Sequence, residues 1–252
     1  LIVISVFFYC HFVSGQIIIS NDTTVCAPYN ATLEALSADV STMFVDDAFD
    51  TLGTVGNPAN SNDVYIGFPF TFYGNTYDYC VVSGNCYISF DTMLNNNPLN
   101  PFNPAYSGFS INAPIPPLIP GTPTPGDIPY NAIMAPWHDI DISVPFGAPT
   151  GRIYYGTVGV APNRRFIVTW CEVPMFSCNS DLHTSQIILH EGTNKIEMFL
   201  QNKPLCIGWN GGAAIQGLVD ATTTNADIVT DPVLGLPRNF PLTWTATNEG
   251  WE

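Results

Sequence analysis

Short segments that alternate apolar with polar residues, or are rich in β-branched residues, constrain the fold of this chain most. Gly, Asn, Asp or Pro closes each segment, and helical periodicity is nearly absent. We expect strands over residues 65–73, 79–83, 86–90, 132–142, 151–157, 165–171, 184–190, 195–201, 213–219 and 242–246. Many short strands separated by turn signals predict an all-β fold, a jelly-roll-like β-sandwich with little or no helix.

Two tight turns and one ambiguous stretch refine this prediction. Residues 83–85 (Ser-Gly-Asn) and 191–194 (Glu-Gly-Thr-Asn) separate predicted strands, and Gly and Asn supply the positive φ that such turns need. Residues 31–40 form the one stretch that also fits a helix, although its first residues alternate as a strand would.

A long insertion interrupts the strands over residues 91–131. Thirteen of the 22 prolines lie between positions 98 and 149, and proline cannot donate to a strand ladder. Strands of similar character flank the segment, so we expect one domain over residues 16–252 that carries a long Pro/Asn-rich loop. Loops of this length inside compact domains are usually functional or flexible.

The first residues predict export. Residues 1–15 read as part of a signal peptide, with an apolar run and a small-residue step before Gln16. The alternative is a buried strand over residues 2–13. We expect a secreted, extracellular protein, and no later stretch is apolar enough to span a membrane as a helix.

The charge balance excludes some partners. The net charge is −15, and all six basic residues follow position 151. Without a basic run, neither nucleic acid nor an anionic membrane is an expected partner. Charged residues make up only 11% of the chain and hydrophobic residues 46%, so the chain is not a disordered acidic tail.

Six cysteines remain after the signal, and an even number in an exported chain favours disulfides. They are Cys26, Cys80, Cys86, Cys171, Cys178 and Cys206. No Cys-x-x-Cys is present, and the histidines of the mature chain are not spaced with cysteines as in zinc sites.

Strand directions favour one cysteine pair. If the strands from 165 to 201 form a meander, Cys178 and Cys206 leave the sheet at the same end, and we predict a bond between them. Pairings with Cys171 or Cys26 stay open. A two-residue turn would place Cys80 and Cys86 on opposite faces, so we expect no bond between these two.

An aromatic stripe marks the strand at 65–73. Phe68, Phe70 and Phe72 share one face, which suits a core facing a second sheet. A sugar-stacking platform is the sharper alternative.

Two carboxylates suggest a possible cofactor, calcium. Asp139 and Asp141 lie two residues apart on a predicted strand and face the same way. They supply only two of the six to eight oxygens that calcium takes. We favour a hydrogen-bonded or solvated strand end over calcium.

A catalytic constellation is not evident. His138 lies beside Asp139, but no nucleophile with a matched base accompanies the pair. We therefore do not expect an enzyme.

Four segments together resemble the NIDO (nidogen-like) extracellular domain, with Cys86 in place of the glycine that usually ends its hairpin. They are IGFPFTFYGNTYDYCVVSGNCYISF (66–90), NAIMAPWHDIDIS (131–143), GRIYYGTVGVAPNRRFIVTW (151–170) and SQIILHEGTNKIEMFLQN (185–202). The combination is similar to N-terminal modules of Bacteroidota gliding-motility-associated surface proteins exported by type IX secretion. The resemblance implies a β-structured module at the cell surface.

We expect a non-catalytic adhesion or assembly module within a larger secreted protein. Its partner would be a protein or glycan at the cell surface, or a second copy of the chain. The alternative is a carbohydrate-binding, lectin-like domain. Candidate contact residues are Tyr106, Ile115 and Leu118 in the insertion and Trp137 beside it.

Overall fold

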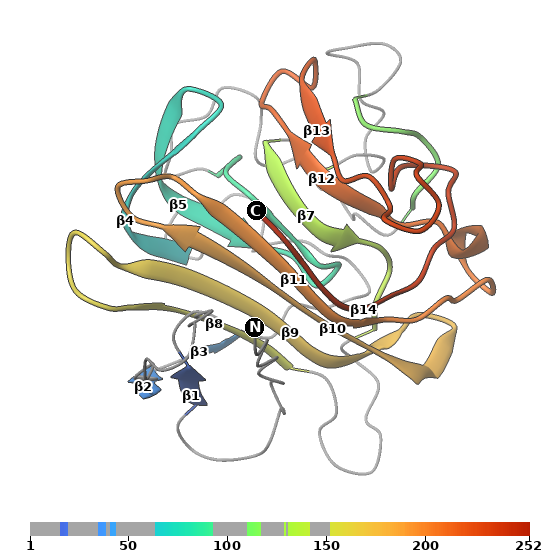
Figure 1. Ribbon diagram of the computed structural model, residues 1–252, viewed down its shortest axis with the longest axis horizontal. Coiled ribbons are helices and arrows are strands. Elements are labelled where there is room, and N and C mark those ends of the chain that lie inside the picture. The colour runs from blue at the N-terminus through green and yellow to red at the C-terminus, as the bar shows by residue number, and fades with distance from the viewer. Residues whose placement is uncertain are drawn as a thin grey trace, which may run out of the picture.

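The structure, a computed structural model, describes residues 16–19, 35–38, 41–43, 64–92, 110–116, 129, 131–141 and 152–252. Two six-stranded antiparallel sheets pack face to face as a β-sandwich (Figure 1). The described residues contain no α-helix and one 3₁₀ turn, η2 (Asn210–Gly212). The predicted all-β sandwich is confirmed.

The first sheet has the strand order β14-β11-β10-β9-β8-β3. Its strands are β3 (Ser41–Met43), β8 (Arg152–Val158), β9 (Arg165–Met175), β10 (Cys178–His190), β11 (Ile196–Lys203) and β14 (Ala246–Trp251). Long hairpins join β8 to β9, β9 to β10 and β10 to β11. The expected meander is therefore present.

The second sheet has the strand order β13-β12-β7-β6-β5-β4. Its strands are β4 (Val64–Phe72), β5 (Asn75–Val82), β6 (Tyr87–Ser89), β7 (Ala132–Trp137), β12 (Ile215–Val219) and β13 (Ala226–Ile228). A separate pair joins β1 (Gln16–Ile19) to β2 (Ala35–Ala38). The ambiguous stretch at 31–40 thus contains a strand.

The main core fills the space between the two sheets. Phe68, Phe70 and Phe72 of β4 are at most 3% exposed and belong to it, which confirms the core interpretation of the aromatic stripe. Trp170 of β9 is fully buried, and its indole N–H donates to the carbonyl of Ser83 in the opposite sheet at 2.8 Å. Buried aromatics at this interface stabilise the sandwich by about 1.5–3 kcal/mol each.

The hairpin between β5 and β6 differs from its predicted form. Val81 pairs with Ser89, and the Ser83 N–H donates to the Tyr87 carbonyl at 3.0 Å. The loop therefore has three residues rather than two, with Cys86 at φ +61° in its last position. This is the left-handed position that glycine usually takes in three-residue hairpin loops, so the chain keeps the turn geometry without glycine.

The strands near the C-terminal end differ from the prediction. Residues 242–245 make only one isolated bridge, from Thr243 to Ala213, and the strand is β14, which begins at Ala246. The three-residue strand β13 was not predicted. The predicted strand at 132–142 is also shorter, because β7 ends at Trp137.

A second apolar cluster covers the outer face of the second sheet. Ile111 and Ile115, from the insertion, pack there with Trp137 of β7 and Ile215 of β12. The side chain of Asn239 brackets Ile115, accepting from its N–H at 3.0 Å and donating to its carbonyl at 2.6 Å. The described part of the insertion therefore packs on the protein's own sheet.

Candidate binding surface

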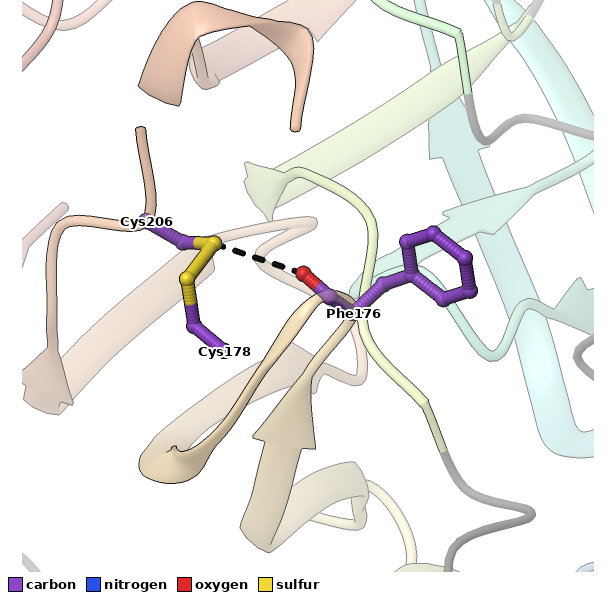
Figure 2. Close-up of a disulfide and its surroundings, with 3 residues drawn as sticks. All are labelled: Phe176, Cys178 and Cys206. Atoms are coloured by element: carbon purple, nitrogen blue, oxygen red, sulfur yellow. Dashed lines mark hydrogen bonds between the residues drawn. A yellow bond between two sulfur atoms is a disulfide. The ribbon is translucent and has the colours of Figure 1, made fainter. Parts of the chain in front are cut away.

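A disulfide joins Cys178 to Cys206, with 5.8 Å between their Cα atoms. Cys178 begins β10, directly after the turn Phe176–Ser177, and Cys206 follows the end of β11. Because β10 and β11 are antiparallel, these two ends lie side by side. The predicted bond is confirmed, and Figure 2 shows it beside Phe176, whose carbonyl oxygen lies 3.3 Å from the Cys206 sulfur.

Cys80 and Cys86 are buried thiols that form no disulfide, as expected. The reasoning for that prediction needs correction, since the three-residue loop places Cys80 opposite Phe90 rather than Ser89. Cys171 is also disulfide-bonded.

The disulfide fixes a loop, residues 204–212, which we call the disulfide-held loop. It leaves the end of β11 on the right of Figure 1 and leads through η2 toward β12. Its apolar side chains face solvent: Ile207 is 73% exposed, Leu205 40% and Trp209 37%. Large apolar side chains gathered on one short surface loop are typical of interaction sites.

Contacts inside and beneath the disulfide-held loop restrict its motion. The Trp209 ring meets the Phe176 ring edge to face, with 5.1 Å between centroids. The N–H of Gly212 donates to the Trp209 carbonyl at 2.9 Å, and that of Ala213 donates to Asn210 at 3.1 Å. The loop is thus held by a covalent bond, a ring contact and two backbone hydrogen bonds.

A second apolar tip follows β13. Val233, Leu234 and Leu236 are 87%, 51% and 50% exposed. Asp231 holds this tip, because its buried carboxylate accepts from the N–H groups of Val233 and Leu234 at 3.0 and 2.8 Å.

The contact residues expected from the sequence do not form a surface. Trp137 has no exposed area and Ile115 only 1%, because both pack in the cluster on the outer face of the second sheet. This corrects the prediction that they meet a partner. Tyr106 and Leu118 lie outside the described residues.

Asp139 and Asp141 are each 7% exposed and lie after the end of β7. Their backbones bind the β9–β10 hairpin: Asp141 N–H donates to Pro174, and Phe176 N–H donates to Asp139. Both residues also take part in further polar or electrostatic interactions. Neither belongs to a group of three metal-ligating side chains in the described residues, so calcium here stays a prediction.

Such a group does exist elsewhere in the described residues. Ligand atoms of Cys86, His138 and His183 all lie within 4.8 Å of one another, in the core. The three residues come from the β5–β6 turn, the segment after β7 and strand β10. Sequence spacing did not reveal this group, because the fold collects its members from segments about 50 residues apart.

The exposed apolar tips could in part have been found from the sequence. Leu205, Ile207 and Trp209 flank Cys206 in a segment with Pro204 and Gly208, which is typical of a loop rather than a strand. The binding residues were instead predicted in and beside the Pro-rich insertion.

No helix in the described part of the chain has the length and hydropathy needed to cross a membrane.

Comparison with known proteins gives one match. A family model described as NIDO related matches residues 37–234, more than three quarters of the chain. The match spans all four segments on which the resemblance was based. No curated protein and no solved structure matches the chain.

Proposed function

The chain belongs to the NIDO-related family, and on this premise we propose that it is a non-catalytic extracellular module that binds a protein partner in adhesion or surface assembly. The disulfide-held loop carries the proposal, since it exposes Ile207 and Trp209 on a fixed backbone. A disulfide of this kind persists in oxidising compartments, which agrees with an extracellular location.

Rigidity is what makes this loop suitable for binding. A flexible loop loses conformational entropy when it is ordered by a partner, and that loss weakens binding. The Cys178–Cys206 bond and the Phe176–Trp209 contact order the loop beforehand. Large side chains such as Trp, held in place at the centre of a contact, supply much of the binding free energy in protein interfaces.

The chemistry of the loop favours a protein over a glycan. Two exposed aliphatic side chains, Leu205 and Ile207, share the loop with Trp209, and they match apolar side chains better than sugar hydroxyls. The net charge of −15 favours a partner with a basic surface around its apolar contact, because complementary charge speeds association.

The setting is part of the same proposal. The four segments resemble modules of Bacteroidota surface proteins of the gliding-motility-associated type, exported by type IX secretion. We place the chain at the cell surface within such a larger secreted protein.

Beads coated with the domain test the proposal when they are applied to cells of the organism that makes the chain. We expect beads that carry the wild-type domain to stay on the cells. Beads that carry the double variant Ile207→Ser/Trp209→Ser should be retained at least about 90% less, since truncation of a hot-spot side chain removes about 2 kcal/mol or more of binding free energy. The matched control is Val160→Ser. Val160 is 80% exposed, but it lies in the β8–β9 turn at the opposite end of β9.

Full retention by the double variant would contradict a role for this loop. A glycan array provides the second arm. Binding to a sugar that Trp209→Ser abolishes would replace the protein partner by the lectin-like alternative. Sedimentation of the wild-type domain shows whether the partner is a second copy of the chain.

A further inference from the structure

The group of Cys86, His138 and His183 is buried and takes its members from both halves of the sandwich. His183 belongs to β10 of the first sheet, and the other two residues belong to the second sheet's β5–β6 turn and the segment after β7. The three side chains are 0%, 2% and 0% exposed. Bulk water therefore does not reach their ligand atoms.

The position of Cys86 follows from the turn. The side-chain oxygen of Asn85 accepts from the N–H of Ile140 at 2.9 Å, and the Cys86 carbonyl accepts from the N–H of Ala135 at 3.0 Å. These bonds hold the turn against residues 135–140. Cys86 and His138 are therefore placed together by the backbone, independently of any ion.

The histidine nitrogens lack the partners that buried polar atoms normally have. Both ring nitrogens of His138 and Nδ1 of His183 make no hydrogen bond within the described part of the chain. Burying an unpaired polar atom is unfavourable, and such atoms call for a specific explanation. A metal ion that accepts the lone pairs of both rings supplies one.

The remaining nitrogen of His183 is already oriented. Its Nε2 lies 2.7 Å from the hydroxyl oxygen of Ser185, two residues along the same strand. With the proton on Nε2, the ring donates to Ser185, and Nδ1 keeps a lone pair that can bind an ion. Metal-bound histidines commonly make such a bond from their second nitrogen, which fixes the ring.

Burial acts on both imidazole rings. Burial, with the nearby charges of His183 and Lys203, keeps the pKa of His138 well below its usual 6.5. Burial and Lys203 lower the pKa of His183 to about 3.

We propose that Cys86, His138 and His183 form a buried three-coordinate site for Cu(I) that links the two sheets. Binding forms one Cu–S and two Cu–N bonds and releases the Cys86 thiol proton to solvent, with no change in oxidation state. Thiolate and imidazole together suit soft d¹⁰ ions.

Charge and ligand number favour Cu(I) over Zn(II). One thiolate and two neutral imidazoles neutralise a monovalent ion but leave a divalent ion with a positive charge inside the core. Structural zinc also takes four protein ligands, whereas the described group has three.

Metal uptake by the whole chain tests the proposal. Cu(I) is offered as its bicinchoninate complex, to the folded protein and during refolding, because the site is closed to solvent; Zn(II) is offered in parallel. We expect about one copper ion and about one released proton per chain. His138→Gln, His183→Gln and Cys86→Ser should each weaken copper binding at least about tenfold.

Two matched variants should retain the ion. Cys80→Ser alters the other buried thiol, and His190→Gln alters a histidine of β10 that pairs with Glu197 outside the cluster. Copper X-ray absorption on the wild-type chain should show one sulfur and two nitrogen ligands, and it needs no variant to fold. Absence of copper uptake, uptake that the histidine variants do not weaken, or preferential retention of Zn(II) would overturn the proposal.

Discussion

Two cationic side chains lie in the interior near the C-terminal end of the chain. Arg238 has no exposed area and Lys203 has 1%, and the ring of Trp244 lies beside both, 4.0 Å from the guanidinium and 4.7 Å from the ammonium. Buried charges persist only where other groups compensate for lost hydration. Arg238 and Lys203 respond to burial in different ways, and each leads to a separate prediction.

Lys203 should make stability depend on pH. Burial, and secondarily the charge of Arg238, lower the pKa of Lys203 from 10.5 to about 7. Between these values the unfolded chain binds a proton on this lysine and the folded chain does not, so stability rises with pH in this window. The slope contributed by Lys203 approaches about 1.4 kcal/mol per pH unit at most.

Denaturant unfolding measures this slope. The free energy of unfolding of the wild type and of Lys203→Met is measured at several pH values from about 7 to about 9, and the value for the variant is subtracted from that for the wild type. The difference removes the titration of all other groups. Methionine keeps the length of the side chain but loses the ammonium bond to the Trp244 carbonyl, which is 2.7 Å long. Parallel pH profiles for the two proteins would show that Lys203 keeps its usual pKa.

Arg238, in contrast, is compensated by ion pairs. Its guanidinium lies 2.9 Å from Asp231 and 2.7 Å from Glu249, and it donates to the Gln216 side chain at 2.7 Å. Arg238→Met should destabilise the fold by about 3–5 kcal/mol, because it leaves the buried carboxylate of Asp231 without its partner. Adding Asp231→Asn should recover part of the loss, as measured by a double-mutant cycle; additive losses would contradict the coupling.

At the scale of elements, the disulfide-held loop is fixed to the β9–β10 hairpin by one covalent bond across 28 residues. Loop-closure entropy predicts a loss of about 3–4 kcal/mol when a bond of this span is removed. Cys178→Ala, Cys206→Ala and the double variant should therefore unfold at nearly the same denaturant concentration, well below the wild type. A double variant clearly less stable than either single variant would indicate contributions from the side chains beyond the bond.

The described part of the insertion is fixed by hydrogen bonds between Asn239 and Ile115. Asn239→Ala removes both hydrogen bonds to the Ile115 backbone, each with a net value of about 0.5–1.5 kcal/mol. We expect a loss of about 1–3 kcal/mol and greater quenching of Trp137 fluorescence by acrylamide, because Ile111 and Ile115 no longer cover the ring. Asn248→Ala, on β14, is the comparison that should leave the quenching unchanged.

The sequence predicts a strand well when one face of the strand is buried and the other is exposed. The nine residues of β4 alternate between buried and more exposed side chains along their whole length, so periodicity located the strand within one residue. The sequence of β14, Ala-Thr-Asn-Glu-Gly-Trp, has no such period. It is held by backbone pairing with β11 and by Glu249, contacts that a local pattern does not encode.

The site residues were harder to predict for a related reason. The Cys178–Cys206 bond followed from strand direction, which the hairpin turns encode. The grouping of Cys86, His138 and His183 depends on how one sheet lies over the other, and spacing along the chain does not contain this information. Trp137 was predicted as a contact residue because an aromatic residue beside a long loop can be either exposed or buried. In the structure it packs in one buried cluster with Ile111 and Ile115.

For the whole molecule, the fold extends beyond the family match. The match ends at residue 234, but β14 completes the first sheet as the neighbour of β11. Arg238 and Trp244 also lie after the match and contact Asp231 and Lys203 within it. A domain defined by the match alone would therefore have an open sheet edge and two buried charges without partners.

We expect a chain shortened to end at Leu234 to fail to fold, whereas one lacking only Glu252 should retain its stability. The first deletion exposes the backbone of β11 as a bare edge, which favours aggregation, and removes the Trp244 carbonyl that binds Lys203. The second removes only a surface ion pair with Lys195, in which the Glu252 side chain is 69% exposed, and such pairs contribute about 0–1 kcal/mol. Size-exclusion chromatography and near-ultraviolet circular dichroism compare both with the full chain. A monodisperse, natively packed product ending at Leu234 would show that the segment after it is an addition to the fold and not part of its core.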